Sequence, residues 1–437
     1  MGFLMKIKTS DILIVGFALF AIFFGAGNLI FPPYLGFTSG ESWLTAALGF
    51  LTSDPFFPIL GVLVSIMLGG QANVLGKRIH PNFGTLLAGI SILLIGPLFS
   101  VPRTGATTHE VFVQSLWPGI PAWVTSLLFF GLTAYLSLNP SKVINHIGKY
   151  LTPMILIILA LLVTVALFNP STPSTTSQVT PVFAYGFKEG YQTMDALGAS
   201  LLASVVMSEL HHRGYTDKKM QMKAGALVGL VAFVLLALVY LSLTYAGASV
   251  STYLPNHLNR TTVFSGTVSL LLGKFGHLFM GICVALACLT TAIGLTSAFS
   301  NFFMNVSKGR LPYQGLTLLA VSVEFIISLI GTEKIIMLAY FILTVIYPIV
   351  MILILFSLFD SYIAHRATYI GAVLGAGCIG LMEAFALANP ALAKSPIIQF
   401  TTSLPLHNYG LEWFFPALGL ALLFTIGSVL HKSFFQK

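Results

Sequence analysis

The sequence predicts an all-α protein that crosses a membrane many times. Three observations support this prediction: 56% of the 437 residues are hydrophobic, only 8% are charged, and the mean hydropathy is +0.92. Soluble globular domains carry about 25% charged residues, so that class is excluded. Three cysteines, Cys283, Cys288 and Cys378, lie inside apolar runs, and their odd number predicts neither a disulfide framework nor a metal site.

Apolar runs close to the length of about 20 residues that spans a bilayer recur twelve times along the chain. The first five cover residues 12–34, 43–68, 83–101, 123–138 and 147–168. The second five cover residues 190–208, 224–246, 277–299, 316–330 and 335–358, and residues 368–387 and 413–430 complete the set. The first run resumes directly after its small residues, so we expect an uncleaved span rather than a signal peptide.

The distribution of basic residues predicts the orientation. With both termini in the cytoplasm, 15 of the 21 Lys and Arg residues fall on the inner side and 6, among them Arg103, on the outer side. This excess in short inner loops fits the positive-inside rule and speaks against nucleic acid as a partner. Two long outer loops follow, residues 171–187 as a strap and residues 247–274, whose apolar side chains predict a lid.

The first span is interrupted at its middle by Gly25-Ala26-Gly27-Asn28, and we expect its second half to stop at Pro32-Pro33. Glycine in a helix interior costs about 1 kcal/mol. Freed backbone groups are tolerated in hydrocarbon only where they line a cavity or bind a ligand. At mid-membrane, such half-helices bind anions with their N–H groups and cations with their carbonyls. A kink or close-packing surface in an ordinary span is the alternative.

A second polar interruption, at residues 190–198, opens the sixth span. Five is an odd number of spans, so two five-helix units in succession have opposite orientations in the membrane, as an inverted repeat requires. The sequence therefore predicts a first repeat over residues 1–168, a second, inverted repeat over residues 169–358, and two accessory helices in residues 359–437.

Four acidic residues fall inside predicted spans, where an acid costs about 2.5–3.5 kcal/mol on insertion scales. Asp195 lies in the sixth-span break, where it is a candidate ammonium partner, proton carrier or gate. Its alternative role is to cap the second half-helix. Asp54 precedes Pro55 in the second span with no assigned role, whereas Glu324 and Glu383 are expected to be structural.

Several motifs resemble those of the bacterial branched-chain amino acid:cation symporter family. They are the residues 24–33 (FGAGNLIFPP), Gly96-Pro97 with residues 101–104 (VPRT), residues 193–197 (TMDAL) and Ile346-Tyr347-Pro348. The resemblance spans nearly the whole chain and implies the leucine-transporter fold of the amino acid-polyamine-organocation superfamily, with broken helices one and six. It implies uptake of leucine, isoleucine and valine, driven by sodium or, in some members, by protons.

The resemblance also implies a sodium site between the first break and the eighth span. The matching positions are the carbonyls of Ala21, Phe24 and Ala287 and the hydroxyls of Thr290 and Thr291. Five oxygens without a carboxylate suit a weakly held, exchangeable ion. A pair of threonines that bond their own backbone is the alternative. A second sodium, which the family fold sometimes holds, would need an asparagine on the seventh span, and none is present there.

The implied substrate site uses both breaks. The substrate carboxylate is expected at the N–H groups of Ala26 and Gly27, at an exposed half-helix end. The full set of expected substrate-binding residues is Phe23, Phe24, Gly25, Ala26, Gly27, Asn28, Gln192, Thr193, Met194, Asp195 and Leu197. Carbonyls near Phe23, Phe24, Gln192 and Thr193 would accept from the ammonium, and Met194 and Leu197 would face the branched side chain.

We therefore expect a sodium-coupled importer of branched-chain amino acids in the bacterial cytoplasmic membrane, with no organic cofactor and no obligate protein partner. A proton-coupled permease that uses Asp195 is the alternative within transport. A channel is a distant alternative because the chain shows isolated polar breaks instead of a continuous polar pore. An enzyme is not expected, since no Ser/His, paired-acid or metal pattern lies on neighbouring spans.

Overall fold

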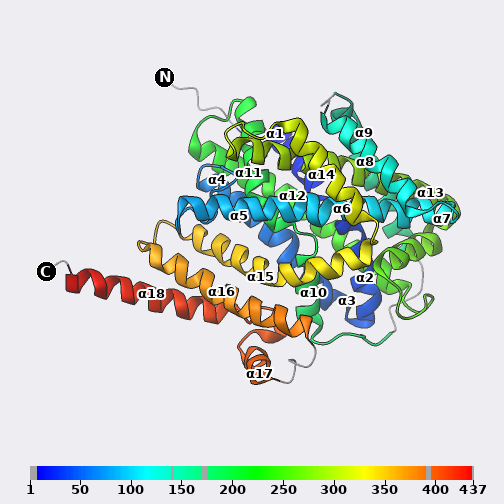
Figure 1. Cartoon of the computed structure of the whole chain (residues 1–437). Helices are drawn as coiled ribbons and strands as arrows, with labels where there is room; N and C mark the ends of the chain where they lie inside the picture. The colour runs from blue at the N-terminus through cyan, green and yellow to red at the C-terminus, as the bar shows by residue number, and fades with distance from the viewer. Residues whose placement is uncertain (1–6, 139–141, 169–174, 390–394, 436–437) are drawn as a thin grey trace.

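The structure is a computed structural model that describes residues 7–138, 142–168, 175–389 and 395–435, and these residues form helices without a strand (Figure 1). The first half contains α1 Thr9–Phe23, α2 Ala26–Ser39, α3 Trp43–Leu51, α4 Phe57–Met67, α5 Pro81–Leu93, α6 Ser100–Thr107, α7 Gln114–Leu116, α8 Ala122–Leu138 and α9 Lys142–Phe168. The second contains α10 Val182–Tyr191, α11 Asp195–His212, α12 Lys218–Ser249, α13 Arg260–Val306, α14 Tyr313–Ser328, α15 Thr332–Leu358, α16 Arg366–Ala388, α17 Pro396–Ser403 and α18 Phe414–Phe435. Among the residues counted in the orientation prediction, Lys6, Lys394 and Lys437 lie outside the described part, as do residues 171–174 of the predicted strap.

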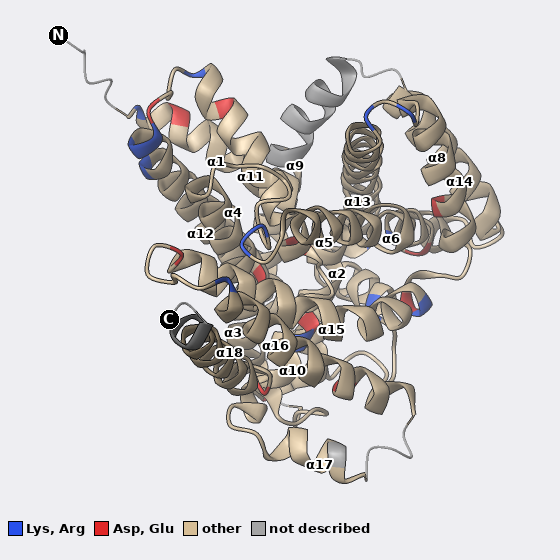
Figure 2. Ribbon diagram, turned by 60° about the vertical axis from the view of Figure 1, so that its left-hand side comes forward, with Lys and Arg blue, Asp and Glu red and all other residues tan. Residues whose placement is uncertain are grey.

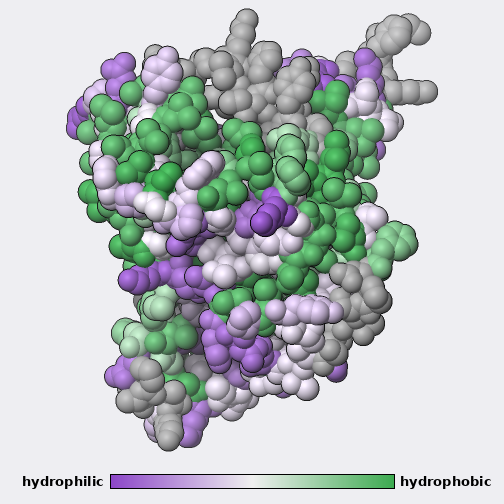
Figure 3. All heavy atoms as spheres, turned by 90° about the vertical axis from the view of Figure 1, so that its right-hand side faces the viewer, coloured by the Kyte–Doolittle hydropathy of each residue, from purple (hydrophilic) through white to green (hydrophobic). Residues whose placement is uncertain are grey.

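The described helices bear out a polytopic membrane protein. Seven helical stretches are long and apolar enough to cross a membrane, or eight when the bent pair α10–α11 counts as one span. Four shorter apolar helices accompany them: Thr9–Phe23, Ala122–Leu138, Met154–Phe168 and Tyr313–Ser328. Hydrophobic residues cover large areas of the face that Figure 3 shows. Many large apolar side chains are exposed, among them Leu128 at 71% and Phe168 at 85%. Such exposure is expected where lipid replaces water as the solvent.

Many Lys, Arg, Asp and Glu residues lie near helix ends, and long stretches of helix carry none of these four residue types (Figure 2). At the start of α1, Asp11 pairs with Arg213, which follows the end of α11, at 3.0 Å. Arg78, in the loop between α4 and α5, pairs with Asp360, in the loop between α15 and α16, at 2.6 Å. These pairs join separate helices at their ends, where water is available to the charges.

The predicted end of the first span at Pro32-Pro33 is wrong. Helix α2 includes both prolines and continues to Ser39, where Gly40 with φ 50° ends it. Proline has a φ that fits a helix, but inside one it removes its own N–H bond and its ring clashes with the carbonyl four residues earlier, at a cost of about 3 kcal/mol. Tight packing on α12 supports the helix: a Cβ on Gly36 would lie 1.8 Å from the carbonyl oxygen of Thr244, and one on Gly247 would lie 1.9 Å from that of Pro33.

Two other predicted boundaries differ from the structure. The sixth span begins at Val182 in α10, so the break lies within the span and not at its start. The third span continues through α6 to Leu116, so Arg103 is 2% exposed inside the protein and is not an outer charge. In both cases charged residues lower the hydropathy of the sequence near the true boundary: Lys188 and Glu189 in the sixth span, and Arg103 in the third. All three side chains have partners in the fold, so they can lie inside a span.

The predicted lid is helical. Residues 260–272 form the first part of α13, which turns at Gly273 with φ 67° before the long apolar part begins. Val263, Phe264 and Val268 of this segment are buried against the helices below. Residues 260–272 therefore pack on the helical domain, and Arg260, the first residue of α13, is also buried.

Candidate functional site

The first helix break separates α1 from α2 at Phe24 and Gly25. In an unbroken helix the N–H of Gly25 would bond to the carbonyl of Ala21. Here it contacts the carbonyl of Phe23 at 2.9 Å and the side-chain oxygen of Asn28 at 3.3 Å. The break thus frees the Ala21 carbonyl at the end of α1, and the first N–H groups of α2 have no partner within their helix.

The second break separates α10 from α11 at residues 192–194, where the two helices bend by 49°. Met194 adopts a left-handed conformation with φ 66°, which a non-glycine residue adopts only at some cost in energy. Asp195 is the first residue of α11, and the N–H of Ala196 donates to the Tyr347 hydroxyl of α15 at 3.3 Å. Strain of this kind is typical of functional sites.

A cavity of about 660 Å³ lies between the two breaks. Nine of the eleven expected substrate residues line it: Phe23, Phe24, Gly25, Ala26, Gly27, Asn28, Thr193, Met194 and Asp195. Gln192 and Leu197 do not line it, although both are buried beside it. The volume falls within the range of about 300–1,000 Å³ that is common for small-molecule sites.

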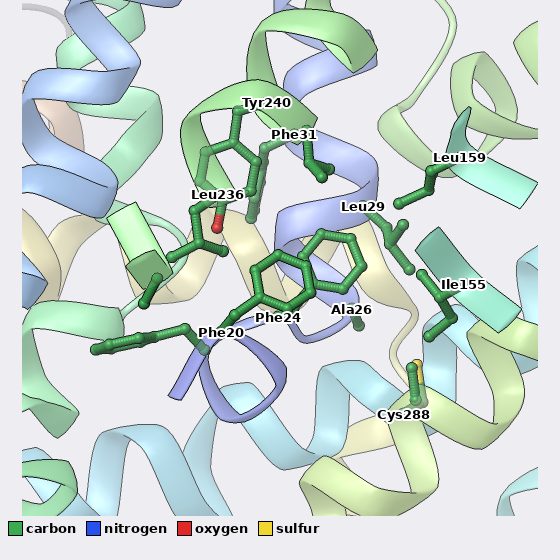
Figure 4. Packing of buried hydrophobic residues seen from close by; sticks show 14 of the residues in the cluster. Phe20, Phe24, Ala26, Leu29, Phe31, Ile155, Leu159, Leu236, Tyr240 and Cys288 are labelled. Carbon is green, nitrogen blue, oxygen red and sulfur yellow. The ribbon is translucent and has the colours of Figure 1, made fainter. Parts of the chain in front are cut away.

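Apolar side chains form the wall of this cavity on the side of α1 and α9. Figure 4 shows Phe20 and Phe24 beside each other below α2, and their ring centroids are 5.2 Å apart in a stacked arrangement. Ile155 of α9 also lines the cavity. Buried apolar surface of this kind suits a hydrocarbon side chain, at about 0.8 kcal/mol for each buried CH₂ group.

Arg103 is the main residue of the cavity that sequence reasoning missed. Its Nη1 donates to the carbonyl oxygen of Gln192 at 2.6 Å, and its guanidinium carbon lies 5.2 Å from the ring centroid of Phe31. The guanidinium also lies against the start of α2, because a Cβ on Gly27 would be 2.8 Å from Nη2. The available signal was a cation directly after an apolar run, which inside a membrane is a functional candidate by default.

Asp195 is the acidic counterpart of Arg103 in the cavity wall. Its Oδ2 accepts from Nδ2 of Asn28 at 2.9 Å, so the two breaks are joined by a direct side-chain hydrogen bond. The cavity therefore offers a cation and an anion next to free helix ends. An α-amino acid carries the complementary pair of charges.

The five expected sodium ligands come from α1, from the break that follows it and from α13. Ala21, Phe24, Thr290 and Thr291 line the cavity, whereas Ala287 lies behind and its carbonyl accepts from the Thr290 hydroxyl at 2.9 Å. The Thr291 hydroxyl lies 3.5 Å from the position of a Cβ on Gly25. The freed Ala21 carbonyl and the Thr291 hydroxyl thus face the same break, and neutral oxygens of this kind suit a monovalent cation.

Arg260, at the start of α13, does not line the cavity but is buried among α2, α10 and α15. Its guanidinium donates to both carboxylate oxygens of Glu189, at 2.7 and 3.3 Å, and pairs with Glu333 at the start of α15. It also stacks 4.5 Å from the ring centroid of Tyr34 on α2. The cavity lining itself extends along α13 to Asn301 and Asn305.

Comparisons with known proteins identify relatives over nearly the full chain. Residues 8–432 match the family described as branched-chain amino acid transport protein. The branched-chain amino acid permease BraB of Bacillus subtilis is 34% identical over 422 residues, covering 94% of each chain. The branched-chain amino acid transport system 3 carrier protein of Pseudomonas aeruginosa is 35% identical over 436 residues, covering 98% of each. The inward-facing structure of Mhp1 matches the fold with a TM-score of 0.63 and 12% identity, covering 96% of this chain and 91% of that one.

Proposed function

The chain belongs to the branched-chain amino acid transport protein family, and from that premise we propose that it imports leucine, isoleucine and valine together with sodium. It is a permease and not an enzyme. The observation that supports the substrate class best is the cavity between the two helix breaks, which places Arg103 and Asp195 beside apolar walls. A zwitterionic amino acid with a hydrocarbon side chain complements all three features.

The substrate carboxylate binds at the N-terminal end of α2, where Ala26 and Gly27 offer N–H groups and Arg103 adds a guanidinium. Helix N-termini and arginine both favour carboxylates. The ammonium lies on the side of Asp195 and the carbonyls of the second break. The Gln192 carbonyl already accepts from Arg103, so Asp195 and Thr193 are left as the nearer acceptors.

Sodium binds to the oxygens of Ala21, Phe24, Ala287, Thr290 and Thr291, and no organic cofactor takes part. The ion bridges α1 and α13, which makes sodium binding and substrate binding mutually dependent. Support comes from the freed Ala21 carbonyl and from the position of Thr291 beside Gly25. Thr290 donates to the Ala287 carbonyl in the structure, and the lone pairs of this hydroxyl are available to the ion.

Transport proceeds by alternating access in the bacterial cytoplasmic membrane. The four shorter apolar helices also cross, which gives twelve spans arranged as a five-plus-five inverted repeat with α16 and α18 as accessory helices and both termini in the cytoplasm. The Arg260 contacts close the outer side, and the cavity extends toward Asn305 at the inner end of α13. We accordingly assign the structure to an inward-facing state.

The experiment that tests the sodium site compares leucine binding against sodium concentration for wild type, Thr290→Val and Thr291→Val at equal folded protein. Valine keeps the shape of threonine and removes an oxygen. Both variants should need more sodium for half-maximal binding, and part of the loss should return at high sodium. The matched control is Thr164→Val on α9, whose hydroxyl only bonds the Ala160 carbonyl. Superimposable sodium curves for all four proteins would refute the site.

A proton-coupled permease that acts through Asp195 is the second candidate. The observation in its favour is that Asp195 lines the cavity and bonds directly to Asn28 of the first break. Asp195→Asn removes the charge while it keeps the shape. Leucine uptake that is driven by a pH gradient without sodium in wild type, and lost in this variant, would select the second candidate.

A further inference from the structure

Behind the substrate cavity, Asp54 completes a buried polar cluster with Asn28, Asp195 and Tyr240. Asp54 lies in the turn between α3 and α4, is 0% exposed, and does not line the cavity. Its Oδ2 lies 3.5 Å from Nδ2 of Asn28, and no described residue donates a hydrogen bond to its Oδ1. The carboxyl groups of Asp54 and Asp195 lie at the same nitrogen, since Nδ2 of Asn28 is 3.5 Å from the first and 2.9 Å from the second.

The orientation of the Asn28 amide determines how many hydrogens the cluster receives. Its Oδ1 accepts from the N–H of Gly25 at 3.3 Å, so Nδ2 must point toward the two acids. The same Nδ2 also contacts the Tyr240 hydroxyl. An amide nitrogen has two hydrogens, and an ionised carboxylate can only accept. The Tyr240 hydroxyl can donate one further hydrogen, but two ionised acids can only accept, so neither could donate a hydrogen bond to the other.

The charges around the cluster lead to the same conclusion. Asp54 is faced by Asp195 from α11, Tyr240 from α12 and Tyr347 from α15, and the nearest cation is Arg103 on α6, beside Asp195. One guanidinium balances one carboxylate and leaves the second unpaired. An unpaired carboxylate without solvent access is unfavourable and takes up a proton instead.

We propose that Asp54 and Asp195 together hold one exchangeable proton, carried by Asp54, and that this proton and the coupling sodium compensate the same buried negative charge. The proton comes from water and returns to water. Asp195 remains ionised toward the cavity, while protonated Asp54 donates the hydrogen that the pair lacks. Asn28 connects the acids to Gly25, whose other side faces Thr291. Loss of the proton thus adds negative charge close to the sodium ligands and strengthens sodium binding.

The first test needs no ligand and is independent of the proposed function. Infrared spectra of the purified full-length protein at about neutral pH should contain a protonated-carboxyl band that disappears in Asp54→Asn. Glu324→Gln is the matched control, since Glu324 is also 0% exposed but lies on α14 with Thr296 as its partner. Its substitution should leave the Asp54 band in place. The proposal is overturned if Asp54→Asn shows every protonated-carboxyl band that the wild-type protein shows.

The second test rests on the proposed sodium coupling. In wild type, the sodium concentration for half-maximal leucine binding should fall by about fivefold or more as the pH is raised. In Asp54→Asn this pH response should be lost. If Asp54→Asn does not fold, Tyr240→Phe keeps both acids but removes their neighbouring hydroxyl, and it must move the pH at which the response occurs. An unchanged response in the folded variants overturns the proposal, whereas leucine binding without any sodium in wild type overturns only the sodium coupling.

Discussion

At the scale of single residues, the proposed function depends on two opposite charges that the fold holds inside a membrane domain. Arg103 and Asp195 come from α6 and α11, and each is fixed by a partner at a helix break: Gln192 for Arg103 and Asn28 for Asp195. Buried charges are retained only when they are paired or hydrogen-bonded. Both side chains are thereby positioned before the substrate arrives, which lowers the entropy cost of binding.

Replacing Arg103 with lysine should weaken leucine binding by about tenfold or more. Hydrogen bonds to charged groups contribute about 1.5–3 kcal/mol, and a lysine ammonium cannot reproduce the bidentate geometry of the guanidinium. The measurement is leucine affinity of folded Arg103→Lys at saturating sodium. Arg310→Lys, at an exposed position, is the matched control and should bind as wild type does. Equal leucine affinity in Arg103→Lys and wild type would remove Arg103 from the substrate site.

At the scale of helices, the two breaks were predictable and their surroundings were less so. The break at residues 25–28 follows from glycines in a long apolar run, and the structure has it at Phe24 and Gly25. Helix α2 passes through Pro32-Pro33 because its packing on α12 supplies stability that local propensity lacks. The sequence predicts Arg103 on the outer side because hydropathy does not include tertiary contacts. In the structure the Gln192 carbonyl accepts a hydrogen bond from the buried guanidinium.

The close contact between α2 and α12 should not tolerate a methyl group. In Gly247→Ala the new Cβ would lie 1.9 Å from the Pro33 carbonyl oxygen, so the helices must separate. We expect a lower yield of folded protein and a lower melting temperature, with a cost of about 1–3 kcal/mol. Gly131→Ala on α8 is the control, since nothing lies within 4 Å of its Cβ position. A melting temperature of Gly247→Ala at or above that of Gly131→Ala would contradict the contact.

The Arg260 contacts should hold the outer side closed. Arg260→Met removes the pairing with Glu189 and Glu333 that joins α13 to α10 and α15. A cysteine in place of Thr107, which is 0% exposed, should then react several-fold faster with a membrane-impermeant reagent from outside. The chain for this test carries Cys378→Ser, because Cys378 is the exposed native cysteine among the described residues. Equal reaction rates with and without Arg260 would show that other contacts close this side.

At the scale of the whole molecule, contacts between distant loops complete the packing of the helices. Arg78 and Asp360 connect the α4–α5 loop to the α15–α16 loop, and the Tyr369 hydroxyl also donates to Asp360 at 2.7 Å. Burial alone would raise the pKa of Asp360, but the hydrogen bonds from Arg78 and Tyr369 outweigh it and lower that pKa. Asp360 thus stabilises the fold while it is ionised.

The pH dependence of this contribution has a definite sign. A carboxylate with a lowered pKa in the folded protein stabilises it above the unfolded pKa of about 4, and the contribution is lost as the pH falls through the lower folded value. Asp360→Asn should therefore reduce stability near neutral pH by about 0.2–1 kcal/mol, the range of partly exposed ion pairs, and the gap to wild type should narrow in acid. Melting curves at several pH values test this, with the exposed Glu41→Gln as control. A gap that widens in acid would contradict the stabilising role of the ionised carboxylate.

The central claim, sodium-driven import of branched-chain amino acids, is tested most directly in proteoliposomes. Uptake of labelled leucine is measured under an inward sodium gradient without a pH gradient, under an inward proton gradient without sodium, and under neither. We predict accumulation only with the sodium gradient, competition by unlabelled isoleucine and valine, and no competition by lysine or glutamate, whose side-chain charges lack partners in an apolar pocket. Accumulation driven by the proton gradient alone, or inhibition by lysine as strong as that by isoleucine, would contradict the account.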